Sequence, residues 1–412
     1  MGKEMVRQHR LANGLHVIGE CNDACQSAAL GFFVRTGSRD EEAPESGVSH
    51  FLEHMMFKGT ATRGALDITM QLGNMGAQAN AFTSEENTVF YGAVVPQYFS
   101  RLQELLSDML RPALDQHEFD TEKKVILEEI ALYQDRPHFY LFEHAMREYF
   151  AGHTAGNSVL GSSESISALS RDQMKAYFER RYRPSNITLV AAGNFDFERF
   201  AADAEKYCGF WPDSEVQRDV SPHQGAEVSK EYAKNNLSQA HVLLISPGCS
   251  AQDDERYALG VLATIIGDST GSRLYWELVN SGMAESAGCD SDEKDGTGCF
   301  VAYASTEPER LDEVGAVLQR VVSSALEFSD DDLERAKTKL AARIVLDGET
   351  PMGRLMSLGN EWVYRRKIHN LKDTVRRLRA VSHDEIRAAL DRYPLRSWSE
   401  FRLLPRWCPE ED

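Results

Sequence analysis

Three residues within one short stretch, His50, Glu53 and His54, have the types and the spacing that metal-dependent hydrolysis requires. On a helix, residues four apart lie one above the other, so both imidazoles can reach one metal ion with the carboxylate of Glu53 beside it. Neutral imidazole is a common zinc ligand, and a neighbouring carboxylate can take a proton from water. The stretch therefore indicates a hydrolytic zinc site, provided that it forms a helix.

A catalytic zinc ion normally has three protein ligands and one open position, so a third donor is needed. The candidate run, residues 119–130, is rich in helix formers, and its apolar residues recur at helical spacing. Glu122 and Glu129 lie seven residues apart in this run, which places them two turns apart on one face of a helix. Either carboxylate could complete the site.

These positions together resemble the M16, or pitrilysin-like, metallopeptidases, whose H-x-x-E-H motif is followed at a similar interval by a glutamate ligand, with another glutamate seven residues earlier. Taken singly, each residue could be an ordinary helix residue. By the resemblance, His50, His54 and Glu129 are expected to bind one Zn²⁺ per chain, Glu53 to be the general base, and Glu122 to be a supporting carboxylate. The resemblance implies peptide hydrolysis, in which Glu53 takes a proton from water and passes it to the leaving amine.

Residues 73–91 are predicted to form a glycine-bearing turn followed by a strand rich in β-branched and aromatic residues. The segment resembles the N-A-x-T element of the same family, where a strand edge pairs with the substrate backbone. Asn80 and Ala81 are therefore expected to bind a peptide substrate through the main chain. The alternative is an edge strand without a ligand.

Composition restricts the class of protein further. The chain has 412 residues, of which 42% are hydrophobic, enough for two or more domains with buried cores. Its net charge of −19 argues against nucleic-acid binding and allows a preference for basic peptides. Neither a membrane-spanning stretch nor a secretory signal is recognisable, so the expected location is the cytoplasm. The seven cysteines are scattered, and no disulfide framework is expected.

The two halves of the sequence repeat one another. Buried strands are predicted at 30–36 and 241–246, and further strands at 89–95 and 299–305, each followed by helices in the same order. We therefore predict an α+β protein with two homologous α/β-roll domains of about 200 residues, each an antiparallel-rich sheet packed with helices. The resemblance implies the LuxS/MPP-like metallohydrolase fold.

The polar, turn-rich residues 216–225 are predicted to link a zinc-bearing N-terminal domain, 1–215, to a C-terminal domain, 226–412. Counting from matching glycines places Val261, Thr264 and Ile265 at the motif positions of the second domain, and Arg343 opposite Glu129. This second domain is expected to bind no metal. The resemblance implies that it forms one wall of a clamshell chamber for the substrate.

One departure from the family affects the expected activity. Many relatives carry an arginine and, seven residues later, a tyrosine after an S-R-L element, and these side chains bind the substrate carbonyl. Here the element is present at 272–274, but Leu278 and Glu285 occupy the two positions. Loss of one oxyanion donor typically lowers the rate by about 10²- to 10³-fold, so the chain alone is expected to be a poor enzyme.

Three hypotheses follow from this departure. The first is the zinc-bearing subunit of a two-chain endopeptidase, with a second M16 subunit supplying the arginine and the tyrosine. The rival is a non-catalytic scaffold or peptide-binding subunit with a residual zinc site, against which the presence of Glu53 argues. A homodimer with other oxyanion donors is the third, and the sequence does not separate it from the first.

Overall fold

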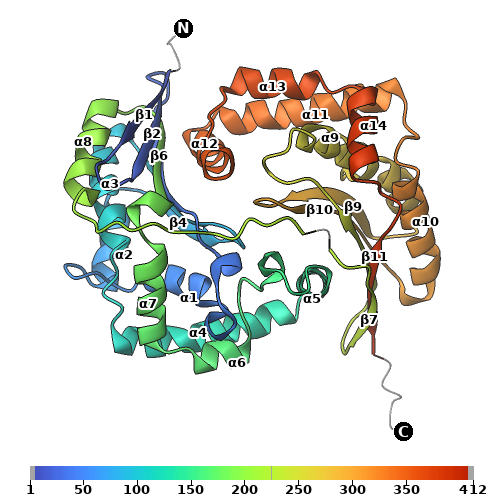
Figure 1. Ribbon diagram of the computed structural model, residues 1–412, viewed down its shortest axis with the longest axis horizontal. Helices are drawn as coiled ribbons and strands as arrows, with labels where there is room; N and C mark the ends of the chain where they lie inside the picture. The colour runs from blue at the N-terminus through green and yellow to red at the C-terminus, as the bar shows by residue number, and fades with distance from the viewer. Residues whose placement is uncertain (1–4, 224, 407–412) are drawn as a thin grey trace. The chain divides into compact units, whose positions relative to one another are not determined.

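The computed structural model describes residues 5–223 and 225–406, drawn as a ribbon in Figure 1. The chain divides into two compact units, and each is discontinuous in sequence. The first contains 1–131, 157–219 and 346–369, and the second contains 132–156, 220–345 and 370–412. The linker expected at residues 216–225 separates the two repeats of the sequence, not these compact units, and it stays a prediction. Over the described residues, no helix combines the length and apolar character needed to cross a bilayer.

The first unit is built on a six-stranded sheet with the order β1-β2-β6-β3-β5-β4. Only the β2–β6 pair is parallel among these described strands. The strands are β1 (Met5–Arg10), β2 (His16–Cys21), β3 (Ala28–Val34), β4 (Gln78–Thr83), β5 (Thr88–Val94) and β6 (Ile187–Gly193).

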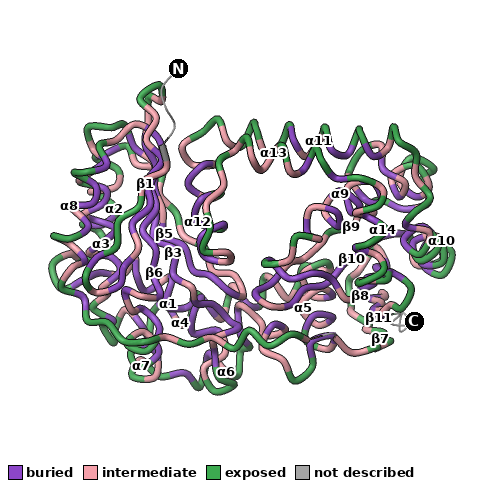
Figure 2. The backbone as a smooth tube through the Cα atoms, turned by 45° about the horizontal axis from the view of Figure 1, so that its top comes forward, coloured by how far each residue is buried: buried purple, intermediate pink, exposed green. Residues whose placement is uncertain are grey.

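Helices cover both faces of this first sheet. On one face lie α3 and α8, and on the other lies α12. Every residue of β3 is consequently buried, as the colouring of Figure 2 shows for the central strands. The helices of this unit are α1 (Val48–Met55), α2 (Ala65–Asn74), α3 (Phe99–Met109), α4 (Gln116–Gln134), α6 (Ser163–Ala168), α7 (Arg171–Arg181), α8 (Phe197–Cys208) and α12 (Pro351–Arg365).

The second unit contains a five-stranded sheet with the order β7-β11-β8-β10-β9, in which only β7 and β11 pair in parallel among the described strands. Its strands are β7 (Ser229–Lys234), β8 (Ala240–Pro247), β9 (Ser286–Glu293), β10 (Gly298–Thr306) and β11 (Ser399–Pro405). Its helices are α5 (Pro137–Tyr149), α9 (Arg256–Gly267), the π-helix η6 (Tyr275–Val279), α10 (Leu311–Ser323), α11 (Asp330–Gly348), α13 (Leu371–Arg379) and α14 (His383–Arg392).

Each sheet carries a helix from the opposite half of the sequence. Leu355, Leu358 and Trp362 of α12 pack with Phe33 and Val190 of the first sheet. Gly359 allows this close approach, because a Cβ atom there would lie 2.1 Å from the ring of Phe33. In the second unit, residues of α5 pack against β8, β10 and β11. The compact units therefore cross the repeat boundary by exchanging one helix each.

The antiparallel-rich, two-sheet α+β architecture confirms the predicted fold class. The predicted strands at 30–36, 89–95, 241–246 and 299–305 correspond to β3, β5, β8 and β10, with ends shifted by up to two residues. One prediction was wrong: residues 73–91 are not a turn and one strand. They contain the end of α2, then β4 and β5, which form a hairpin around residues 84–87.

Candidate metal centre

Helix α1 places the two histidines of the motif side by side. His50 and His54 lie one turn apart, and their ring centroids are 4.8 Å apart. His50 is only 8% exposed. Burial, with a smaller effect from His54, lowers the pKa of His50 to about 4. Its imidazole is therefore neutral near neutral pH, which is the form that binds a metal.

Helix α4 brings Glu129 to these imidazoles. The rings of Phe51 on α1 and Phe119 on α4 stack with centroids 4.7 Å apart, which holds the two helices together. Oε2 of Glu129 lies 3.7 Å from Nε2 of His50 and 3.6 Å from Nε2 of His54. The predicted third donor thus reaches both predicted imidazoles.

These three residues fit a zinc ion. Each offers a ligand atom, and these atoms all lie within 4.8 Å of one another. Zinc–ligand distances of about 2.0–2.1 Å in a tetrahedron separate the ligand atoms by about 3.3 Å, a few tenths of an ångström less than the spacings to Glu129. Two imidazole nitrogens and one carboxylate oxygen also form a donor set that zinc prefers.

Glu53 lies on the same helix and is held by β4. Its Oε2 accepts a hydrogen bond of 2.6 Å from Oγ1 of Thr83, the last residue of β4. Burial raises the pKa of Glu53, and the hydrogen bond from Thr83 offsets part of that effect. A carboxylate with a raised pKa is a better proton acceptor near neutral pH.

Glu122 contacts His54 instead of joining the ligand cluster. Its Oε1 lies 2.8 Å from Nδ1 of His54, and its Oε2 lies 2.5 Å from Nζ of Lys58. Burial favours a higher pKa for Glu122, but the hydrogen bonds from Lys58 and His54 outweigh it and lower the pKa. An ionised carboxylate only accepts hydrogen bonds, so Nδ1 of His54 donates and Nε2 keeps its lone pair for a metal.

The beginning of α1 is fixed by a buried carboxylate. Glu41, which is 5% exposed, accepts hydrogen bonds from the backbone N–H groups of Gly47 (2.7 Å) and Ser49 (2.8 Å). Gly47 has φ +89°, and a Cβ there would lie 2.5 Å from the carbonyl oxygen of Leu160. Only glycine suits both the left-handed backbone and this close contact. The histidine-bearing helix therefore starts from a well-defined position.

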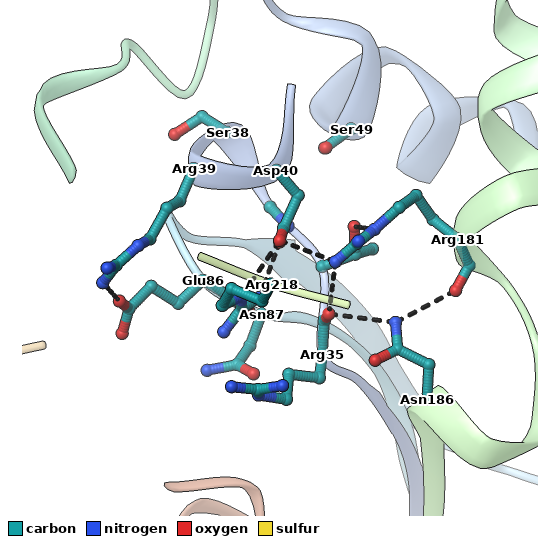
Figure 3. A network of polar contacts seen from close by, with 12 residues as sticks. Arg35, Ser38, Arg39, Asp40, Ser49, Glu86, Asn87, Arg181, Asn186 and Arg218 are labelled. Carbon is teal, nitrogen blue, oxygen red and sulfur yellow. Dashed lines mark hydrogen bonds and ion pairs between the residues drawn. The ribbon is translucent and has the colours of Figure 1, made fainter. Parts of the chain in front are cut away.

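The loop that carries Glu41 is itself anchored by a buried ionic network (Figure 3). Asp40 pairs with Arg181 of α7 and with Arg218, each at 2.6 Å. Arg39 pairs with Glu86 of the β4–β5 turn at 2.6 Å. Because these partners come from distant parts of the sequence, the network fixes the loop relative to both α7 and the β4–β5 hairpin, in which Thr83 is the last residue of β4.

The predicted substrate contacts lie on β4, the last strand in the order of the described first sheet. Asn80 is exposed and Ala81 is half-buried. Both residues pair with β5 on one side of β4. The other side of the strand is the edge of the described sheet, as a peptide-binding strand requires. The substrate role of Asn80 and Ala81 itself stays a prediction.

The second unit lacks the chemistry of the first at the matching positions. Val261 and Ile265 are core residues of α9, with exposures of 0% and 4%. Within the described residues, His50, His54 and Glu129 form the one cluster of this kind that could hold a metal. Leu278 is fully buried and Glu285 is exposed just before β9, so neither replaces the expected arginine or tyrosine.

Three residues of this site were not found from the sequence: Thr83, Lys58 and Glu41. Thr83 is the last letter of the N-A-x-T element, which was a signal that it had a role. Lys58 follows the motif by four residues, a spacing at which a helix-like turn allows a second contact. For Glu41 no local pattern was available, since its partners lie six and eight residues ahead.

Comparison with protein families identifies the chain. The insulinase (peptidase family M16) profile matches residues 16–163, and the peptidase M16 inactive domain profile matches residues 168–340. An uncharacterized zinc protease of Streptomyces coelicolor is 31% identical, with 93% of this chain and 86% of that protein covered. The uncharacterized zinc protease YmxG of Bacillus subtilis is 28% identical over 93% of this chain and 94% of its own. The chain belongs to the M16 peptidase family.

Solved structures agree on the fold. The crystal structure of a protease from Helicobacter pylori has a TM-score of 0.90 and 19% identity, with 98% of this chain and 100% of that chain covered. A peptidase M16 inactive domain from Pseudomonas fluorescens also reaches a TM-score of 0.90, at 17% identity and with 98% and 99% covered. The predicted family membership is confirmed. The relatives named as zinc proteases also support the expectation of zinc.

Proposed function

We propose that this chain is a zinc-dependent endopeptidase that cleaves peptides or unfolded segments. The observation that carries the proposal is the meeting of His50, His54 and Glu129 beside a carboxylate, Glu53, that is held by Thr83. A purely structural zinc site has no need for such a base, because its coordination is closed by protein ligands.

Zn²⁺ held by the three ligands would act as a Lewis acid that acidifies water and polarises a carbonyl oxygen. Glu53 takes one proton from the attacking water as the new C–O bond forms. Oε2 of Glu53 accepts the hydrogen bond from Thr83, which leaves Oε1 available to receive this proton. The same proton passes to the amine nitrogen as the C–N bond breaks, so the base is restored.

The edge of β4 is proposed to position the substrate. An extended peptide can add to the edge as a further strand, with its backbone running past Asn80 and Ala81. Thr83 at the end of the same strand contacts Glu53. A peptide bound in register on β4 is therefore held on the strand that also fixes the base.

We further infer that the chain is the metal-bearing subunit of a two-chain peptidase. Leu278 has no hydrogen-bond donor on its side chain, and the carboxylate of Glu285 would repel an oxyanion. A second M16 subunit with arginine and tyrosine at these places would supply the missing stabilisation, worth about 10²- to 10³-fold per donor. A homodimer with other donors is the alternative arrangement.

The test combines a peptide-cleavage assay with metal analysis. Wild type and Glu53→Gln are measured with and without a homologous subunit that carries the arginine and the tyrosine. We expect about one zinc per chain in both proteins, weak cleavage by the wild type that increases with the partner, and no cleavage by Glu53→Gln. Full activity of the chain alone would reject the partner dependence and leave the peptidase assignment intact.

The rival function is a non-catalytic scaffold with a residual zinc site. It is favoured by Leu278 and Glu285, and the fold also matches a chain in the structure of complex III2 from Candida albicans, with a TM-score of 0.84 at 16% identity. If the chain binds zinc but no partner or peptide gives cleavage that depends on Glu53, the chain acts as a non-catalytic scaffold.

A further inference from the structure

Lys58 lies three residues beyond the end of α1 and contacts the buried face of α4. We propose that Lys58 is a positioning residue of the metal site, which fixes Glu122 and through it the imidazole of His54, and thereby sets the affinity for a divalent cation. This inference rests on the proposed function, since it concerns the same metal site.

The geometry links three side chains in series. The ammonium group of Lys58 lies 2.5 Å from Oε2 of Glu122, while Oε1 of Glu122 lies 2.8 Å from Nδ1 of His54. A carboxylate held at one oxygen can still rotate, because its terminal torsion is broad. Contacts at both oxygens remove that freedom, so Lys58 determines the orientation in which Glu122 meets His54.

Burial makes this contact important for Glu122. Its side chain is only 6% exposed, whereas that of Lys58 is 30% exposed. Without Lys58, Glu122 would be a buried carboxylate whose remaining partner is a single imidazole N–H. Such a group tends to turn towards water or another donor, and His54 would then lose the acceptor that selects its tautomer.

The other histidine has no comparable support. Within the described chain, Nδ1 of His50 is buried and has no hydrogen-bond partner. Its ring is held by packing on α1, where it is 8% exposed. Of the two imidazoles, His54 is therefore the one whose orientation depends on the Lys58–Glu122 contact, and it is also the more exposed ring.

Positioning and simple electrostatics predict opposite effects. Lys58 is positive, so its removal would by charge alone strengthen the binding of a divalent cation. Loss of an outer-shell partner typically weakens metal binding by about 10- to 100-fold. A weaker affinity after removal of a positive charge is consequently evidence for positioning and against a general charge effect.

The experiment measures the Kd for Zn²⁺ of the full chain by competition with a chelator. Lys58→Met is expected to bind zinc about tenfold more weakly, and Lys58→Gln to show a smaller loss. Lys58→Arg should keep most of the affinity, because a guanidinium can hold a carboxylate. The matched control is Lys124→Met, because Lys124 is exposed on α4 and the substitution removes the same charge. The Kd of Lys124→Met for Zn²⁺ should be unchanged or slightly lower than that of the wild type.

Two further measurements separate positioning from a loss of folding. The double variant Lys58→Met/Glu122→Gln should bind zinc no more weakly than Glu122→Gln alone, because Lys58 acts through Glu122. The visible absorption of bound Co²⁺ should change in Lys58→Met and be restored in Lys58→Arg, while far-UV circular dichroism of the metal-free proteins stays the same.

The possible results are distinct. Equal Kd values for wild type, Lys58→Met and Lys124→Met would overturn the inference, as would additive losses in the double variant. If Lys58→Met does not fold, Lys58→Gln and Lys58→Arg decide by the same criteria. A wild-type chain that binds no zinc would instead contradict the proposed function.

Discussion

At the scale of single residues, Thr83 is the contact on which the proposed base depends. Its hydroxyl donates a 2.6 Å hydrogen bond to Glu53. A hydrogen bond to a charged group is worth about 1.5–3 kcal/mol, so Thr83→Val is expected to lower kcat by about 10- to 100-fold. Steady-state kinetics checks this, with KM and zinc content expected to stay close to the wild-type values.

Thr83→Ser is the matched control, because it keeps the hydroxyl and should keep most of the activity. An unchanged kcat in Thr83→Val would show that the orientation of Glu53 does not depend on β4. A parallel loss of zinc would mean that the substitution disturbs the site as a whole.

The residues of the site differ in how far the sequence could predict them. The neighbourhood of His50, Glu53 and His54 follows from helical spacing, which is local and therefore readable. Glu129 needed the family resemblance, because no local rule brings residues so far apart together. Lys58 and Thr83 each carried a local signal, but their contacts with Glu122 and Glu53 depend on packing between elements and were missed.

At the scale of elements, the start of α1 provides a prediction with a pH dependence. Burial raises the pKa of Glu41 to about 7, although hydrogen bonds from Ser49 and Gly47 lower it and Asp40 raises it further. The folded chain then holds a proton that the unfolded chain has released between about pH 4.5 and about pH 7. The contribution of Glu41 to the free energy of unfolding therefore falls as the pH rises through this window.

Glu41→Gln removes this titration. Between about pH 5 and about pH 8, the free energy of unfolding of the wild type should fall relative to that of Glu41→Gln, by on the order of 3 kcal/mol. Urea unfolding at several pH values measures the difference in unfolding free energy between the two proteins. The contributions of other titrating groups cancel, because both proteins contain them. Parallel curves would contradict the prediction. The variant also replaces one acceptor oxygen by an amide, so it should be the less stable protein at low pH.

The attachment of α12 to the first sheet gives a second prediction at this scale. Nε of Arg354 donates to Glu20 of β2 at 2.8 Å, and both side chains are 9% exposed. Arg354→Met leaves Glu20 buried without this partner, which should cost about 3–5 kcal/mol of unfolding free energy. Urea unfolding of the variant measures the loss.

A double substitution tests the cause of that loss. Replacement of both Arg354 and Glu20 by apolar residues of similar size should recover much of the stability, because no buried charge is left unpaired. If the double variant is as unstable as Arg354→Met, packing of the arginine stem and not the charge pair holds α12.

Apolar runs predicted the buried strands well, because strands covered on both faces are apolar throughout. The hairpin of β4 and β5 was not separated, since its turn lacks the glycine or proline that usually marks one. The exchange of α5 and α12 could not be predicted. An apolar helix face does not specify which of two similar sheets it will cover.

At the scale of the whole molecule, the net charge of −19 predicts an effect on substrate choice. A negative surface potential attracts cationic peptides, and salt screens this attraction over about 8–10 Å at physiological ionic strength. The KM for a lysine-rich peptide should therefore rise with added salt, while that for a neutral peptide of equal length should change little. Equal salt dependence for the two peptides would mean that charge does not guide binding.

The repeat of the sequence was readable at this scale because it preserves the order of strands and helices in both halves. The repeat also predicts that the second domain binds no metal, since Val261 and Ile265 carry no ligand atom, and this stays a prediction. The division into compact units was not, because it depends on the two exchanged helices.

The most direct test of the central claim is a crystal structure of the zinc-loaded chain with anomalous scattering recorded at the zinc edge. The account predicts a single strong peak about 2.0–2.2 Å from Nε2 of His50, Nε2 of His54 and a carboxylate oxygen of Glu129. Glu122 should lie outside this distance and remain in contact with His54. A peak on other residues, or none at this position in a protein shown to be loaded with zinc, would contradict it.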